Sequence, residues 1–169
     1  MKPRSIAIAA VLSISLTGLG ATMASAETQT VKTGSTSSGK VLVGANGKTL
    51  YVFAADSPGK STCTSACAQA WPPVLATAKT LGRSADVKAK LTVIKRSDGK
   101  SQLAVNGLPA YTFSGDSAAG QALGQGMNAS GGLWWVIAPS GTPIKTTTSP
   151  GSGTTPGCTT TPGGTYDYY

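Results

Sequence analysis

Two cysteines stand four positions apart in the stretch 51–73, "YVFAADSPGKSTCTSACAQAWPP". If Cys63 and Cys67 lie across one helical turn, helix geometry places their Cα atoms about 6 Å apart. A disulfide spans roughly 4.4–6.8 Å between Cα atoms, so this spacing suits one. Nearby thiols pair in an oxidising compartment, and the pattern therefore predicts a structural Cys63–Cys67 disulfide in an exported protein.

The same two cysteines leave a redox or copper site open as the alternative. Dithiol oxidoreductases usually carry Cys-x-x-Cys in a βαβ unit, whereas this spacing is one residue longer and no such unit is indicated. Copper(I) prefers soft sulfur ligands, which Cys63, Cys67 and Met127 could supply if the fold joined them. Structural zinc needs four Cys or His ligands, and the chain has three cysteines and no histidine. We predict no metal and no cofactor, and leave Cys158 free or paired with another molecule.

Acid–base catalysis has few residues to draw on. Without histidine, the usual general base near neutral pH and the Ser-His and Cys-His nucleophile pairs are absent. Paired carboxylates could still hydrolyse glycosides, and Asp56 with Asp116 is the symmetric pair, while Asp98 is required by its turn. The sequence predicts no catalytic residue and favours a protein that is not an enzyme.

Three tryptophans are the candidate binding residues: Trp71, Trp134 and Trp135. Large aromatic side chains in Gly- and Pro-rich surroundings can stack on sugar rings or anchor a partner protein. Neighbouring residues on a strand point to opposite faces. We therefore expect one of Trp134 and Trp135 to be buried and the other to be exposed.

An internal repeat aligns "NGKTLYVFAADS" at 46–57 with "NGLPAYTFSGDS" at 106–117. Each copy predicts a turn, a strand and a second turn. Within each strand the Tyr and the Phe share one face, because side chains alternate, and we expect both pairs in the core. Each Asp should fix its turn by bonding the backbone N–H two residues further on. The repeat-motif residues are Tyr51, Phe53, Asp56, Tyr111, Phe113 and Asp116.

Turn signals predict an all-β fold. Asn46-Gly47, Asp98-Gly99, Asn106-Gly107 and Ser140-Gly141 each separate short apolar runs, and such dipeptides favour tight hairpin turns. Helical turns are expected at 64–71, beside the cysteine pair, and at 84–90. The prediction is a single small antiparallel domain over 40–145, built from two related halves that each contain a β-hairpin.

The two ends of the chain have distinct compositions. Lys2 and Arg4 precede an uncharged apolar run, and Ala24-Ser25-Ala26 follows, a pattern typical of a signal peptide over 1–26 that is cut before Glu27. The apolar run is shorter than the roughly 20 residues of a membrane span, so we expect no transmembrane segment in the mature chain. Residues 27–39 indicate a flexible polar linker, and the Thr/Pro/Gly-rich residues 146–169 a disordered tail.

The charge balance is basic, with 14 basic and 6 acidic residues. Removing the signal peptide leaves 12 basic residues against 6 acidic ones. Such a charge favours loose attraction to anionic surfaces. The lysines are scattered, so no specific nucleic-acid site is predicted, and the expected partner is a cell-wall polymer or an envelope protein.

The repeat motif resembles that of the bacterial secreted-repeat lipoproteins, Tyr-x-(Phe/Trp/Tyr)-x-x-Asp. Here it stands as "YVFAAD" at 51–56 and "YTFSGD" at 111–116, with the flanks "STCTSACAQAWPP" and "GQALGQGMNASGGLWWVIAPSG". The resemblance covers about 40–141 and implies an exported protein of a family whose function is unknown. Members are often lipid-anchored, but this chain has no cysteine before Cys63, so the anchor is not carried over. We expect a non-enzymatic binding or structural module, secreted or associated with the cell envelope.

Overall fold

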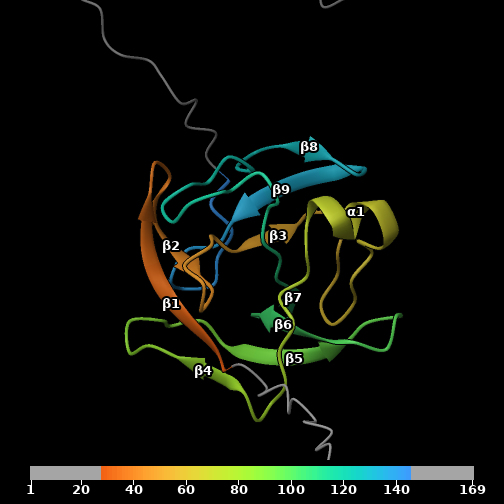
Figure 1. Cartoon of the computed structure of the whole chain (residues 1–169), viewed down its shortest axis with the longest axis horizontal. Coiled ribbons are helices and arrows are strands. Elements are labelled where there is room, and N and C mark those ends of the chain that lie inside the picture. Colours follow the sequence, from red (N-terminus) through yellow and green to blue (C-terminus); the bar gives the residue numbers. More distant parts are fainter. Residues whose placement is uncertain (1–27, 146–169) are drawn as a thin grey trace, which may run out of the picture.

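Residues 28–145 are described by the structure, a computed structural model, and they form a domain made mostly of strands (Figure 1). The single helix in this range lies beside the cysteine pair, where the sequence predicted a helical turn. The elements in chain order are β1 (Gln29–Thr36), β2 (Gly39–Val43), β3 (Tyr51–Phe53), α1 (Ser65–Ala70), β4 (Leu81–Arg83), β5 (Leu91–Lys95), β6 (Ser101–Val105), β7 (Leu108–Pro109), β8 (Asn128–Ala129) and β9 (Gly132–Val136).

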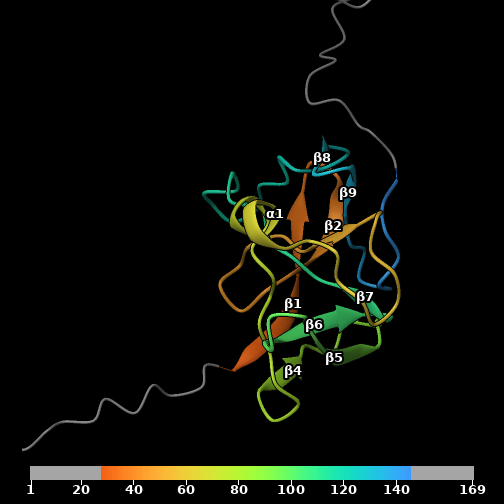
Figure 2. The same ribbon diagram turned by 90° about the vertical axis from the view of Figure 1, so that its right-hand side faces the viewer.

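The strands of this range form three small sheets, with orders β2-β1-β4, β3-β9-β8 and β5-β6-β7. Neighbours are antiparallel except for β1 and β4, which are parallel. Both views place α1, β8 and β9 at one end of the domain and β4, β5 and β6 at the other, with β1 running between them (Figures 1 and 2). The predicted all-β class and the two-halves architecture are confirmed.

Turn chemistry explains the predicted hairpins that form. Asn106 and Gly107 both have positive φ angles, 50° and 87°, which is the requirement of a type I′ turn, and they join β6 to β7. Gly99, with φ 78°, lies in the turn between β5 and β6. Gly47 turns the chain as expected, but the strands on either side, β2 and β3, belong to different sheets. The chain nevertheless pairs across this turn as predicted, because Val43 and Thr49 form an antiparallel bridge and the Leu50 N–H donates to the Leu42 carbonyl at 2.9 Å.

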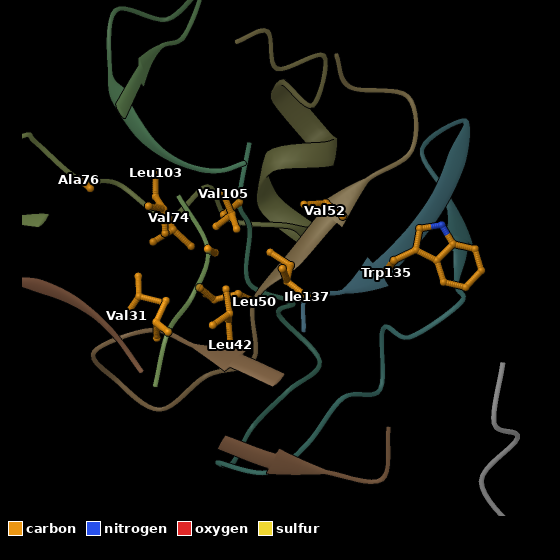
Figure 3. Close-up of a cluster of buried hydrophobic side chains, with 13 residues drawn as sticks. Val31, Leu42, Leu50, Val52, Val74, Ala76, Leu103, Val105, Trp135 and Ile137 are labelled. Atoms are coloured by element: carbon orange, nitrogen blue, oxygen red, sulfur yellow. The ribbon is translucent and has the colours of Figure 1, made fainter. Parts of the chain in front are cut away.

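The core has two parts on opposite faces of the β3–β9 ladder. Val52 and Trp135 pair in this ladder and belong to an aliphatic cluster with Val31, Leu103 and Ile137, with Trp135 at its edge (Figure 3). The alternate residues of the same two strands point the other way, into an aromatic cluster. Strand alternation thus sends one ladder's side chains into both clusters.

The interpretation of residues 27–39 as a flexible linker is wrong for most of that segment. Gln29 to Val31 pair with β4, and Lys32 to Thr36 pair with β2. Val31, the single apolar side chain of the segment, is fully buried. The segment's own composition predicts no core, but two neighbouring strands satisfy its backbone groups and bury that one valine.

The helical turn expected at 84–90 is also absent. The backbone N–H groups of Lys88 and Ala89 donate to the carbonyl of Pro139, at 2.9 and 3.1 Å. This long-range pairing holds the segment in a non-helical conformation and overrides its weak helix propensity. The predicted signal peptide over 1–26 and the predicted disordered tail over 146–169 lie outside the described residues, as does Glu27.

Candidate functional site

The two copies of the repeat motif meet at their tyrosines. The backbone N–H of Tyr51 donates to the carbonyl of Tyr111, and the N–H of Tyr111 donates to the carbonyl of Tyr51, each at 2.9 Å. The strand that follows the tryptophan of each half pairs with the tyrosine of the other half: Val136 lies opposite Tyr51 and Pro73 opposite Tyr111. The halves are therefore interleaved, so neither half completes its own strand pairing.

The side chains repeat this exchange. The Tyr51 hydroxyl donates to Oδ2 of Asp116 at 2.7 Å, and the Tyr111 hydroxyl donates to Oδ2 of Asp56 at 2.6 Å. We call these two bonds the crossed Tyr–Asp pairs. Asp116 and both tyrosines are fully buried, whereas Asp56 is half-buried. Each motif's carboxylate thus binds the phenol of the other motif and ties the two halves together.

The second oxygen of each carboxylate holds a loop. Asp56 Oδ1 accepts from the N–H and the hydroxyl of Thr62, at 2.7 and 2.8 Å. Asp116 Oδ1 accepts from the N–H of Leu123 at 2.9 Å. The expectation that each Asp bonds an N–H two residues on is wrong. The bonded N–H lies six or seven residues on, because the loop returns to the buried tyrosine.

Four aromatic rings stack between the two halves. Phe53 lies on Trp134, Trp134 on Trp71, and Trp71 on Phe113, with centroid distances of 4.3, 3.9 and 4.3 Å. We call this group the aromatic stack. Tyr51 meets Trp71 and Tyr111 meets Trp134 edge-on, at 5.4 and 5.2 Å. Of the motif aromatics expected in the core, Tyr51, Phe53 and Tyr111 are buried, whereas Phe113 is half-buried and packs against the cluster.

The tryptophans do not form the exposed platform that the sequence suggested. Trp134 and Trp135 do point to opposite faces, but their exposed fractions are 0 % and 9 %, and that of Trp71 is 1 %. The expectation of one exposed tryptophan is wrong because both faces of the β3–β9 ladder are covered by core. All three candidate binding residues are packed inside the domain.

Cys63 and Cys67 form the predicted disulfide, with a Cα–Cα distance of 5.2 Å. Cys67 lies in α1, whose first turn brings it back toward Cys63. Cys63 is fully buried in the aromatic cluster, and Met127 packs against the same cluster. Of the three sulfur atoms considered for copper, two are therefore joined to each other in a disulfide. Cys158 lies outside the described residues.

Sequence reasoning missed the role of Arg96. This side chain is buried, and its guanidinium donates to Ser61 Oγ at 2.8 Å, to Gln102 Oε1 at 2.7 Å and to the Cys63 carbonyl at 2.8 Å. Ser61 Oγ in turn lies 2.7 Å from the Tyr111 hydroxyl. Through these bonds Arg96 connects the Tyr111–Asp56 pair to the loop that carries the disulfide. Its position beside a turn gave it the signature of a solvated surface charge.

The carboxylates of the described residues are all engaged. Asp86 accepts from the hydroxyls of Ser84 and Thr33, and these bonds hold its pKa below the ordinary value. The pKa of Asp98 is lowered by the N–H of Lys100 and by Arg96, with which it forms an ion pair at 3.3 Å. Among residues 28–145, no group of three or more Cys, Asp, Glu or His side chains is placed to hold a metal ion. The hydrogen-bonded carboxylates therefore suit a structural role, in which they hold parts of the fold together.

Burial raises the pKa of Tyr51 and Tyr111 well above the ordinary value, and the neighbouring carboxylates of Asp116 and Asp56 raise them further. Both phenols therefore stay protonated and keep donating at neutral pH. Protonated phenols and engaged carboxylates hold the crossed Tyr–Asp pairs together across the physiological range.

Raising the pH above about 10 will destabilise the fold. An unfolded phenol loses its proton near pH 10, whereas the buried phenols keep theirs. The unfolded state then binds fewer protons, so stability falls by up to about 1.4 kcal/mol per pH unit for each tyrosine. Tyrosinate absorbance and circular dichroism should show that two of the five tyrosines ionise only as the fold is lost. Ionisation of all five in a domain that stays folded would contradict this.

The domain is a β module made of two units. Each unit supplies strand pairing, a carboxylate and stacking rings to the other unit, and this exchange defines the class of protein. A family model described as a secreted repeat of unknown function matches residues 32–75 and 92–138, which together make up more than half of the chain. The chain belongs to this secreted-repeat family. No curated protein and no solved structure matches the chain.

The two matched regions correspond to the two interleaved units. The first contains β3, α1 and Trp71, and the second contains β6, β9 and Trp134. The resemblance inferred from the Tyr-x-Phe-x-x-Asp motif is thereby confirmed. In residues 28–145 the one helix, α1, has six residues, and no helix of this range is long and apolar enough to cross a membrane.

Proposed function

We propose that this chain is an exported, non-enzymatic binding module that acts at the cell envelope or outside the cell and is retained there by anionic polymers. The secreted-repeat family supports export. All three tryptophans are buried. We therefore expect charge, and not aromatic stacking, to attract the polymer to the protein.

One observation carries the proposal: in the described part of the chain the acidic side chains are bonded within the fold, whereas most of the lysines are exposed and form no ion pair. The described residues contain four aspartates and no glutamate, and each aspartate is bonded to neighbouring groups of the fold. The same residues contain ten lysines, nine of them exposed, and none forms an ion pair with a described carboxylate. An outer surface rich in unneutralised lysines attracts polyanions without a defined pocket.

Salt-dependent retention on isolated cell walls tests this proposal. Mature protein collected from culture medium, whose first residue should be Glu27, should bind walls at 0.1 M salt and elute by 1 M. The Debye length falls from about 10 Å to about 3 Å over that range. Walls stripped of their anionic polymers should bind roughly tenfold less. Retention that persists at 1 M salt, or on stripped walls, would refute charge-based binding.

Two matched variants separate a diffuse surface from a local site. Changing Lys32, Lys40, Lys60 and Lys100 to Gln removes four exposed charges, and changing Lys79, Lys88, Lys95 and Lys145 to Gln removes four others. If attraction is spread over the surface, both variants should elute at similarly lower salt. If one variant loses retention and the other keeps it, the polymer binds a local site and the diffuse mechanism is wrong.

The sequence-based alternative, a thiol or copper redox role, requires Cys63 and Cys67 as thiols. A redox titration followed by metal analysis of the reduced protein distinguishes it from the binding module. Stoichiometric copper on the reduced form, lost in Met127→Leu, would favour the alternative and count against the proposed function.

A further inference from the structure

Two sheets leave an edge strand facing the same groove. β4 is the outer strand of the β2-β1-β4 sheet, and β5 is the outer strand of the β5-β6-β7 sheet. Figures 1 and 2 both place the two strands together at one end of the domain. A groove of about 420 Å³ lies between them, lined by Ala78, Leu81, Gly82, Arg83, Lys90, Leu91, Thr92 and Val93. Its volume is within the range of clefts that hold ligands.

The lining shows that the groove runs along the strand edges. Successive residues of a strand point to opposite faces. The groove is nevertheless lined by three consecutive residues of β4, Leu81–Arg83, and by Lys90 together with the first three residues of β5. A space lined by consecutive residues of both strands lies beside their backbones. Its two walls are therefore the sides of β4 and β5 that no described strand pairs with.

The lining also combines apolar and positive groups. Leu81, Leu91 and Val93 are half-buried and pack against the aliphatic cluster. Arg83 and Lys90 are exposed, and neither forms an ion pair with a described carboxylate. Arg83 also donates to the carbonyl of Ala89 at 3.1 Å, which places its guanidinium near the start of β5. The groove thus offers apolar contacts and two cations beside two rows of backbone groups.

We propose that this groove binds an extended, acidic segment of a partner protein, which adds as a strand between β4 and β5. Exposed sheet edges accept such strands through main-chain hydrogen bonds, while alternate side chains supply specificity. The added strand would join β2-β1-β4 to β5-β6-β7 in one continuous sheet. Its apolar side chains would contact the leucines and the valine, and its carboxylates would pair with Arg83 and Lys90.

Charge argues for an acidic partner over a second copy of this domain. The described residues contain twelve basic and four acidic side chains, so two copies repel each other. A polysaccharide, in turn, lacks the regular row of N–H and C=O groups that a strand edge pairs with. An acidic polypeptide satisfies both the backbone and the charge of the groove.

Defined peptides test the proposal on the mature protein labelled with ¹⁵N. The probe is a capped Val-Glu-Val-Glu-Val peptide, compared with Val-Lys-Val-Lys-Val and with an N-methylated form of the first. Amide shifts should be largest at 81–83 and 90–93. The lysine peptide and the N-methylated peptide should each bind at least ~10-fold more weakly, since one reverses the charge and the other removes main-chain donors.

Matched variants locate the contact. Lys90→Glu should weaken the acidic peptide about tenfold. Lys95→Glu changes an exposed lysine at the far end of β5 that does not line the groove, and it should leave binding within about twofold. Equal loss in both variants, or equal binding of the N-methylated peptide, would overturn strand addition. Shifts scattered over other lysines would do the same.

The outcome is separate from that of the proposed function. Lys90→Glu should lower wall retention no more than Lys95→Glu, because each reverses one of many charges. Loss of peptide binding with wall retention intact therefore bears on the groove alone. Wall polymer that shifts the same amides as the peptide and displaces it would mean that the groove is a polymer site, which refutes the peptide proposal.

Discussion

Replacing Trp134 with alanine is expected to lower the free energy of unfolding by about 3–5 kcal/mol. Trp134 is fully buried and stacks on both Phe53 and Trp71. Its indole N–H also donates to the carbonyl of Ala129 at 3.1 Å, which is lost with the ring. Trp71→Ala should have a similar effect, because Trp71 occupies the equivalent place between Trp134 and Phe113. Denaturant melts measure both.

The double variant provides the sharper result. The ring centroids of Trp71 and Trp134 lie 3.9 Å apart. The loss of stability in the double variant should therefore be smaller than the sum of the two single losses, by at least about 1 kcal/mol. Leu123→Ala is the control, since Leu123 is 59 % exposed and should change stability by less than about 0.5 kcal/mol. Additive losses, or two stable single variants, would show that the aromatic stack is not the shared core of the halves.

Asp116→Ala is expected to destabilise the domain by about 2–4 kcal/mol, because it leaves the buried Tyr51 hydroxyl and the Leu123 N–H without their acceptor. Asp56→Ala should cost less, about 1–2 kcal/mol, because Asp56 is half-buried and water can replace it beside Thr62. The expected order is therefore set by burial, although the two motifs have the same sequence pattern. Melts of both variants at neutral pH test this order.

A double-mutant cycle isolates the bond across the halves. Tyr51→Phe combined with Asp116→Ala should show a coupling of about 1–3 kcal/mol. Tyr51→Phe combined with Asp56→Ala is the matched control, because these two residues share a motif but bond to different partners, Tyr51 to Asp116 and Asp56 to Tyr111. Stronger coupling within a motif than across motifs would overturn the crossed arrangement.

Several features of the fold followed from local chemistry. Asn106-Gly107 tolerates two positive φ angles, so its dipeptide predicted the turn. Cys63 and Cys67 are so close in the chain that a single helical turn brings them together, and their pairing was predicted correctly. The repeated motif predicted two related halves and buried aromatics. Each of these inferences depends on residues within a few positions of one another.

Long-range pairing decided what the sequence analysis got wrong. Residues 29–36 lack the apolar side chains of a core strand, yet partners on both sides make them β1. Trp135 is covered because a second cluster packs on its face of the ladder. Arg96 is buried because Ser61, Gln102 and the Cys63 carbonyl converge on it. None of these partners is encoded near the residue concerned.

The sequence by itself determined that two similar units exist, that each contains a strand with Tyr and Phe on one face, and that an Asp follows each strand. Only the tertiary structure decided that each unit's Asp binds the other unit's Tyr. The physical reason is that a repeat specifies identical units but not how they pair. Exchanging partners buries both tyrosines and stacks both tryptophans in one core, and that gain depends on contacts about 60 residues apart in the chain.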